Sequence, residues 1–119
     1  MNVSSLDRIA MRSFSSLEKE SLYQMVCGAM SVDGYRDPRE SALVEEIVNL
    51  IGLTDAERVA SRSLDQPTMV RTLKSMPVIK KCYLAKFVCQ VVLADGIVDP
   101  KEETFVKYYF NLLDIPEID

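Results

Sequence analysis

Two stretches decide the fold of this chain: LADGIVDPKE at Leu93–Glu102 and SVDGYRDPRE at Ser31–Glu40. Each contains the pattern Asp-Gly-x-x-Asp-Pro-x-Glu, and the two copies lie 62 positions apart. A glycine after apolar helical residues favours a left-handed helix stop. Asp-Pro-x-Glu then supplies an N-cap, a proline at the first helical position and a capping-box acid. Each stretch therefore predicts the end of one helix and the start of the next.

The similarity between the two halves extends beyond this pattern. Residues 26–55 align without gaps on residues 88–117, and ten of the 30 positions are identical, where average composition would give about two. The identical pairs are Val26/Val88, Cys27/Cys89, Asp33/Asp95, Gly34/Gly96, Asp37/Asp99, Pro38/Pro100, Glu40/Glu102, Val44/Val106, Asn49/Asn111 and Leu50/Leu112. Duplication of a helical hairpin explains the match and predicts two similar hairpins packed with pseudo-twofold symmetry.

Apolar residues recur at helical spacing on both sides of each motif. The stripes are Leu22, Met25, Val26, Ala29; Leu43, Ile47, Leu50; Leu84, Val88, Val91; and Phe105, Tyr109, Leu112. We expect the helices that end near Asp33 and Asp95 to pack against each other at the centre, because their stripes are the most apolar. Strand-like alternation of apolar and polar residues is absent from the sequence.

The predicted fold is therefore all-α, with about seven helices including a short N-terminal one. The first hairpin occupies about 17–51, a helical connector about 54–76, and the second hairpin about 79–113. Together they form a single domain over residues 1–119.

Two further helix starts are predicted from capping boxes. Ser15 is followed three residues later by Glu18, and Thr54 by Glu57. In such a pair the hydroxyl and the carboxylate each accept a hydrogen bond from the other residue's backbone N–H.

The amino-acid composition limits the classes of protein to which this chain can belong. A hydrophobic fraction of 48% and a charged fraction of 27% are typical of a globular domain with a proper core. The longest apolar stretch, Cys82–Ala94, is interrupted by Lys86 and Gln90, so it is too short and polar to span a bilayer. No secretory signal is recognisable, and a cytoplasmic protein is expected. The chain has no histidine, which excludes Ser-His and Cys-His catalysis and histidine-based metal sites, so we do not expect an enzyme.

The charges are unevenly distributed along the chain. The net charge is −4, yet seven basic residues lie between Arg58 and Lys86 against one acid, Asp65. Two interpretations remain open: solvated helix faces, or a basic surface for an anionic partner. The acidic total argues against nucleic acid as that partner.

Three cysteines, Cys27, Cys82 and Cys89, lie within apolar helical patterns. An odd number at such positions predicts reduced, buried and unreactive thiols.

The motif acids are the candidate metal ligands: Asp33, Asp37, Glu40, Asp95, Asp99 and Glu102. Asp33 and Asp95 continue the apolar stripes and face the negative end of the helix dipole, so their carboxylates need a compensating group. Either the N–H groups of the following helix or a divalent cation could supply it. All-oxygen ligands favour calcium, magnesium or manganese, and no organic cofactor is expected. The four other acids, Asp37, Glu40, Asp99 and Glu102, have a complete structural explanation as helix caps.

A standard EF-hand does not match either copy. The first and third positions of its loop would be Ala29 and Ser31, or Val91 and Leu93, which belong to the incoming helix and offer at most one hydroxyl.

The duplicated motif resembles that of the tellurite-resistance TerB-like family, in which an Ala-Asp-Gly helix end precedes an Asp-Pro-x-Glu helix start. Leu93–Glu102 fits closely, whereas Ser31–Glu40 departs from the pattern at Val32 and Arg36. The resemblance covers about Leu17–Leu113. It implies an all-α pseudo-symmetric bundle, bacterial stress response and divalent-metal binding through these acids. It implies no enzymatic activity, and tellurite itself is not implied for this member.

Two functions follow as hypotheses. The first is a non-enzymatic stress-response module that binds a divalent metal through its acidic motifs and docks onto other proteins. The second is a pure protein-protein interaction domain in which the acids act only as helix caps.

Overall fold

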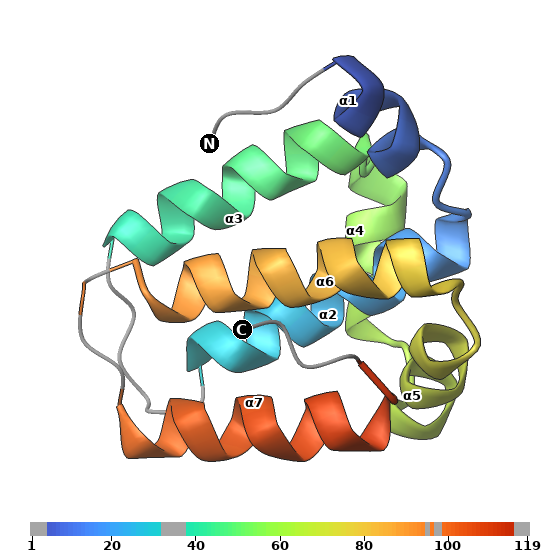
Figure 1. Cartoon of the computed structure of the whole chain (residues 1–119). Helices are drawn as coiled ribbons and strands as arrows, with labels where there is room; N and C mark the ends of the chain where they lie inside the picture. The colour runs from blue at the N-terminus through green and yellow to red at the C-terminus, as the bar shows by residue number, and fades with distance from the viewer. Residues whose placement is uncertain (1–4, 32–37, 95, 97–98, 116–119) are drawn as a thin grey trace.

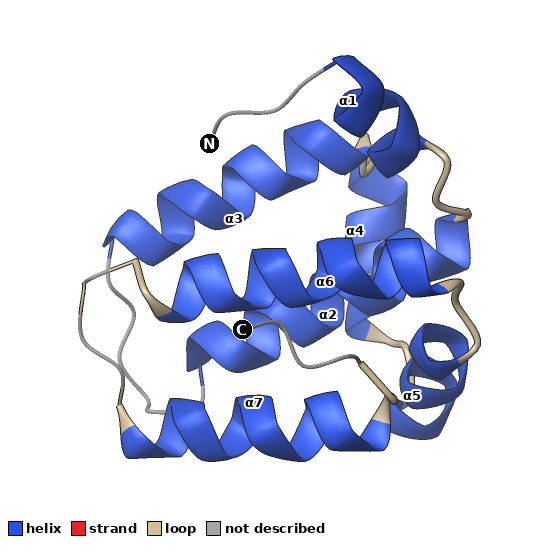
Figure 2. Cartoon of the chain, in the orientation of Figure 1, coloured by secondary structure: helices blue, strands red, loops and turns tan. Residues whose placement is uncertain are grey.

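The computed structural model describes residues 5–31, 38–94, 96 and 99–115. Within them it holds seven helices and no strand, which confirms the all-α prediction (Figures 1 and 2). None of these helices is long and apolar enough to cross a bilayer. In chain order they are α1 (Ser5–Arg12), α2 (Ser16–Ser31), α3 (Pro38–Ile51), α4 (Asp55–Arg62), α5 (Gln66–Lys74), α6 (Val78–Val92) and α7 (Pro100–Leu112).

The centre of the molecule is formed by α2 and α6. In α2, Leu22 and Ala29 are fully buried. In α6, Leu84, Phe87 and Val91 are fully buried. Burial of each large apolar side chain contributes about 1.5–3 kcal/mol. The two helices pack against each other, and α6 crosses in front of α2 in Figure 1, so the predicted central pair is confirmed.

Both capping boxes predicted outside the motif are present. The Ser15 N–H donates to Glu18 Oε1 at 2.8 Å, and the Glu18 N–H donates to Ser15 Oγ at 3.1 Å. Thr54 and Glu57 form the same pair of bonds at 2.9 and 3.1 Å. Each box satisfies two of the N–H groups that the first turn of a helix leaves without a backbone acceptor.

Two glycines adopt the left-handed conformation expected at helix ends. Gly52 directly follows α3 with φ of 71°, and Gly96 lies four residues after the end of α6 with φ of 78°. Residues with a Cβ rarely adopt such angles, so glycine is favoured at both positions. Gly34, the counterpart of Gly96 in the first motif, lies outside the described residues.

The helix boundaries repeat with the same offset as the motif. α6 begins 62 residues after α2, at positions 78 and 16, and α7 begins 62 residues after α3, at positions 100 and 38. α5 ends 62 residues after α1, at positions 74 and 12. The described helices thus fall into two series, α1–α2–α3 and α5–α6–α7, with α4 inserted between them.

The last helices of the two series differ in how well they are covered. Ile47 of α3 is 2% exposed, whereas Tyr109, its counterpart 62 positions later in α7, is only half-buried. Leu50 of α3 is buried and its counterpart Leu112 is half-buried. α1 packs on α3, whereas α5 packs on α2. A groove therefore remains between α5 and α7.

Candidate functional site

The structure places three of the six candidate metal ligands. Glu40 lies in the first turn of α3, Asp99 is the N-cap of α7, and Glu102 lies in the first turn of α7. The other three lie outside the described residues: Asp33, Asp37 and Asp95. The C-terminal ends of α2 and α6 and the N-terminal ends of α3 and α7 lie on one side of the molecule, at the left of Figure 1. The two motifs therefore connect helices that meet at the same end of the bundle.

Asp99 and Glu102 form the capping box that the sequence predicts for α7. Asp99 Oδ1 accepts a hydrogen bond from the Lys101 N–H at 2.7 Å. Glu102 Oε1 accepts one from the Asp99 N–H at 3.3 Å, a longer bond than those in the Ser15 and Thr54 boxes. Both carboxylates therefore have a role in ending the loop and starting the helix.

Glu40 and Glu102 occupy equivalent positions of the two motifs and are buried to the same extent. Each is 2% exposed, which is unusual for glutamate. Their place in the first turn puts them at the positive end of a helix dipole, which stabilises the ionised form. Carboxylates at this depth require hydrogen bonds or a counter-charge to offset their loss of hydration.

The motif acids offer the type of ligand that a hard divalent cation prefers, because all their ligand atoms are carboxylate oxygens. Among the residues that the structure describes, no three acidic, cysteine or histidine side chains lie close enough together to hold a metal ion. A complete site would therefore need at least one acid from outside that part of the chain.

The glutamates of the other two capping boxes each have a lysine partner that connects separate helices. Lys80 of α6 lies 2.7 Å from Glu18, and Lys19 of α2 lies 3.0 Å from Glu57. Burial alone would raise the pKa of Glu57, but hydrogen bonds from Ser16, Thr54 and Lys19 outweigh it and lower that pKa to about 2. These lysines were not predicted from the sequence, because they lie 62 and 38 positions from their partners.

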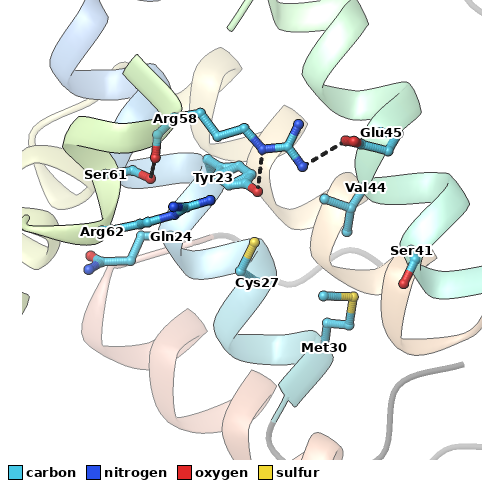
Figure 3. Close-up of a pocket in the computed structure, with 10 residues that line it drawn as sticks. All are labelled: Tyr23, Gln24, Cys27, Met30, Ser41, Val44, Glu45, Arg58, Ser61 and Arg62. Atoms are coloured by element: carbon cyan, nitrogen blue, oxygen red, sulfur yellow. Dashed lines mark hydrogen bonds and ion pairs between the residues drawn. The ribbon is translucent and has the colours of Figure 1, made fainter. Parts of the chain in front are cut away.

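A cavity of about 410 Å³ opens between α2, α3 and α4 (Figure 3). Arg58 of α4 forms the wall at the top of Figure 3. The Arg58 Nε donates to the Tyr23 hydroxyl at 2.8 Å, and Nη2 lies 2.9 Å from the Glu45 carboxylate. The guanidinium also lies over the Tyr23 ring, 5.1 Å from its centroid. Arg58 thus joins the three helices around the cavity.

Apolar and sulfur-containing side chains form the opposite walls. Val44 and Met30 are 4% and 5% exposed. The Cys27 sulfur points into the space between them and Arg58 in Figure 3. Burial, followed by a hydrogen bond with Cys27, raises the pKa of Tyr23, so this phenol stays neutral.

Arg62 forms the remaining wall and is exposed. In Figure 3 it reaches along the Tyr23 and Gln24 side of the cavity, opposite Glu45. The cavity combines residues that are distant in sequence, and it was not predicted from the sequence. The spacing of residues within one helix cannot reveal this cavity, because the two arginines lie on α4 and Glu45 lies on α3.

The basic residues between Arg58 and Lys86 are divided among α4, α5 and α6. Arg58 is paired with Glu45, and Lys74 lies 3.9 Å from Asp114. Lys81 is 7% exposed. The basic residues of this segment are therefore distributed over three helices, and Arg58, Lys74 and Lys81 are ion-paired or buried.

The groove between α5 and α7 has a volume of about 530 Å³. Val70 and Leu112 contribute apolar surface, and Arg71 and Lys74 contribute positive charge. Tyr108, which also lines it, is 59% exposed. The groove can therefore accept a segment that carries both apolar and acidic side chains.

The cysteines are free thiols, as the sequence predicts, but they are less buried than predicted. Cys27, Cys82 and Cys89 are each partly exposed. Cys27 lines the cavity because the described side chains of α2, α3 and α4 leave the space between them open. Burial still raises the pKa of the Cys89 thiol, which keeps it protonated and slow to react.

Comparison with known proteins supports the architecture. No protein-family model matches the chain, and no curated protein sequence does. The fold is similar to a crystal structure of a protein of unknown function from Porphyromonas gingivalis, with a TM-score of 0.76 and 22% sequence identity. The match covers 99% of this chain and 86% of that one. At this identity the likeness concerns the fold alone.

Proposed function

We propose that the chain is a non-enzymatic, TerB-like binding module of the cytoplasm that holds a divalent cation through its acidic motifs and docks onto partner proteins. The observation that carries this proposal is the pair Glu40 and Glu102. They are equivalent residues of the two motifs, and each is 2% exposed in the first turn of a helix. The motifs thus concentrate shielded carboxylates at one end of the bundle, where a cation would neutralise them.

The proposal includes a pseudo-twofold arrangement of two hairpins. The common offset of 62 residues between the starts of α2 and α6, and of α3 and α7, supports it. Residues 17–51 should superpose on residues 79–113. An experimental structure in which these segments have different helix packing would contradict this part of the proposal.

A bound cation would be calcium, magnesium or manganese, which prefer carboxylate oxygens. Within the described residues the ligands would be Glu40, Asp99 and Glu102. The remaining candidates are Asp33, Asp37 and Asp95. When bound, the cation would supply positive charge and would stabilise the folded state according to its concentration. The absence of histidine from the sequence supports a binding role over catalysis.

The docking surface we propose is the groove between α5 and α7, and its occupant an acidic amphipathic segment of a partner protein. Arg71 and Lys74 supply complementary charge, while Val70 and Leu112 supply apolar surface. A helical peptide of glutamate and leucine should bind, and its lysine-leucine analogue should not. Arg71→Glu should weaken binding of the acidic peptide, measured by fluorescence anisotropy. Equal binding of both peptides would contradict the proposed occupant.

A second candidate function is a pure interaction domain with the motif acids acting only as caps. The observation that favours it is the Asp99–Glu102 capping box, which already gives both carboxylates a backbone partner. In this case the chain would bind proteins without any requirement for metal.

Thermal melts with and without cations distinguish the two functions. The purified chain is stripped with a chelator and melted in buffer, calcium, magnesium or manganese. Under the metal proposal at least one cation raises the melting temperature, and Asp33→Asn or Asp95→Asn abolishes most of that rise. The same substitutions should slightly stabilise the metal-free protein, because carboxylate repulsion is relieved.

If the acids are only caps, no cation changes the melting temperature of the parent protein. The asparagine variants then lose about 1 kcal/mol at most, because asparagine keeps a hydrogen-bond acceptor. Native mass spectrometry of the untreated protein gives an independent reading of a bound ion.

A further inference from the structure

The cavity between α2, α3 and α4 carries more positive than negative charge. Among the described residues that line it, Arg58 and Arg62 are basic and Glu45 is the one acid. Arg62 forms no hydrogen bond or ion pair with the part of the chain that the structure describes. Arg58 uses Nε and one terminal nitrogen for Tyr23 and Glu45, so the second terminal nitrogen still has donors to offer. The cavity therefore has a net charge of about +1 and unused guanidinium donors.

The positions of the charges define one end of the cavity as the anion end. Figure 3 shows Arg62 and Glu45 at opposite sides of the space, with Arg58 between them. An anion near Glu45 would be repelled, whereas one near Arg62 would meet a cation that is not paired with any carboxylate among the described residues. Guanidinium groups bind carboxylate and phosphate oxygens through paired, charge-assisted hydrogen bonds.

The rest of the cavity suits an apolar group. Val44 and Met30 form its inner wall, and both are buried. The volume of about 410 Å³ lies within the range of pockets that enclose small organic molecules. Methionine adapts its side chain to ligands of different shape.

We propose that this cavity binds a small organic anion, with its carboxylate or phosphate head on Arg62 and Arg58 and its apolar chain against Val44 and Met30. This site is separate from the motif acids, and it does not depend on metal binding. Occupation would also connect α4 to α2 and α3 through the ligand, in addition to the bonds that Arg58 makes.

The test uses hexanoate and hexyl phosphate as probes and methyl hexanoate as a neutral match, added to the isotope-labelled full chain. We expect both anions to shift the amide signals of Tyr23, Cys27 and Arg62, with a Kd of about 1 mM or tighter. Methyl hexanoate should leave these signals unchanged. The tighter of the two anions identifies the head group of the natural ligand.

Two variants distinguish binding of the anion in this cavity from non-specific attraction of the anion to the positive charges of the protein. Arg62→Gln should weaken anion binding about tenfold, because it removes a charge-assisted pair of hydrogen bonds from an exposed position that the fold does not need. Arg8→Gln makes the same change of charge at an exposed position of α1 outside the cavity, and it should change binding less than twofold.

Alkylation of Cys27 provides a second reading on the same samples. The anion should slow iodoacetamide labelling of Cys27 and not of Cys82, which lies on α6 outside the cavity. The proposal is overturned if methyl hexanoate binds as well as hexanoate, if Arg62→Gln binds the anions as tightly as the parent, or if neither anion shifts the cavity signals.

Discussion

Glu18 and Lys80 form an ion pair with each other at 2.7 Å, although they occupy equivalent positions of the two repeats, 62 residues apart. A contact between equivalent residues arises where a twofold axis passes between two halves. The pair therefore supports the proposed pseudo-symmetry. It also joins the starts of α2 and α6, and the Lys80 ammonium lies 5.3 Å from the centroid of the Phe14 ring.

Removal of this pair should reveal a measurable coupling. Glu18→Gln keeps a capping acceptor, and Lys80→Met keeps the apolar stem over Phe14, so the double-mutant cycle isolates the charge interaction. We expect a coupling of about 1 kcal/mol in the free energy of unfolding, because both side chains are less than one fifth exposed. The exposed pair Glu103–Lys107 is the control and should show a much smaller coupling. Equal coupling for the two pairs would contradict a role at the interface of the repeats.

Acid should destabilise the protein partly through Glu57. Its folded pKa is about 2, below the ordinary value of 4.5, so its stabilisation is complete above pH 4.5 and is lost as the pH falls towards 2. Glu57→Gln should lower the free energy of unfolding at pH 7 by on the order of 2 kcal/mol and flatten the decline below pH 4.5. Urea unfolding at several pH values measures both effects. A variant whose stability declines in parallel with the parent would show that other groups control the acid response.

Alanine should have opposite effects at two glycines. Gly96→Ala places a Cβ at φ of 78°, where no other described residue comes within 4 Å of it, so backbone strain should cost about 1 kcal/mol. Gly28 lies within α2, and its added Cβ would lie 3.4 Å from the half-buried Phe105 ring. Helix propensity should make Gly28→Ala neutral or stabilising. Thermal denaturation of the two variants tests the contrast, and a similar loss at both positions would refute it.

Tyr23→Phe should loosen α4. The change removes the hydroxyl that accepts from Arg58 Nε but keeps the ring beneath the guanidinium. We expect a loss of about 1 kcal/mol in the free energy of unfolding, with faster amide hydrogen exchange in α4 than in α6. Tyr108→Phe, at an exposed tyrosine of α7, should change neither quantity. Uniform acceleration of exchange in all helices would show that Tyr23 supports the whole core and not α4 in particular.

Much of the fold follows from local rules that the sequence carries by itself. Asp99, Pro100 and Glu102 start α7 because an N-cap, an N1 proline and a capping acid act within one turn of backbone. Gly96, four residues after the end of α6, adopts its backbone conformation for an equally local reason, its freedom to take positive φ. The 62-residue repeat then predicted the second pair of helices from the first.

The candidate sites depend on contacts that no local rule contains. Arg58 meets Tyr23 and Glu45 because α2, α3 and α4 pack side by side, and the open cavity beside Arg62 exists because their side chains do not fill the space between them. The unequal burial of α3 and α7 also comes from the packing of whole helices. The repeat gives both helices similar apolar stripes, so the sequence of each helix does not explain the difference. The sequence by itself determined where helices begin, end and recur, because capping and φ preferences act over a few residues. The tertiary structure alone decided which charges pair and which surfaces stay open, because those outcomes depend on how whole helices pack.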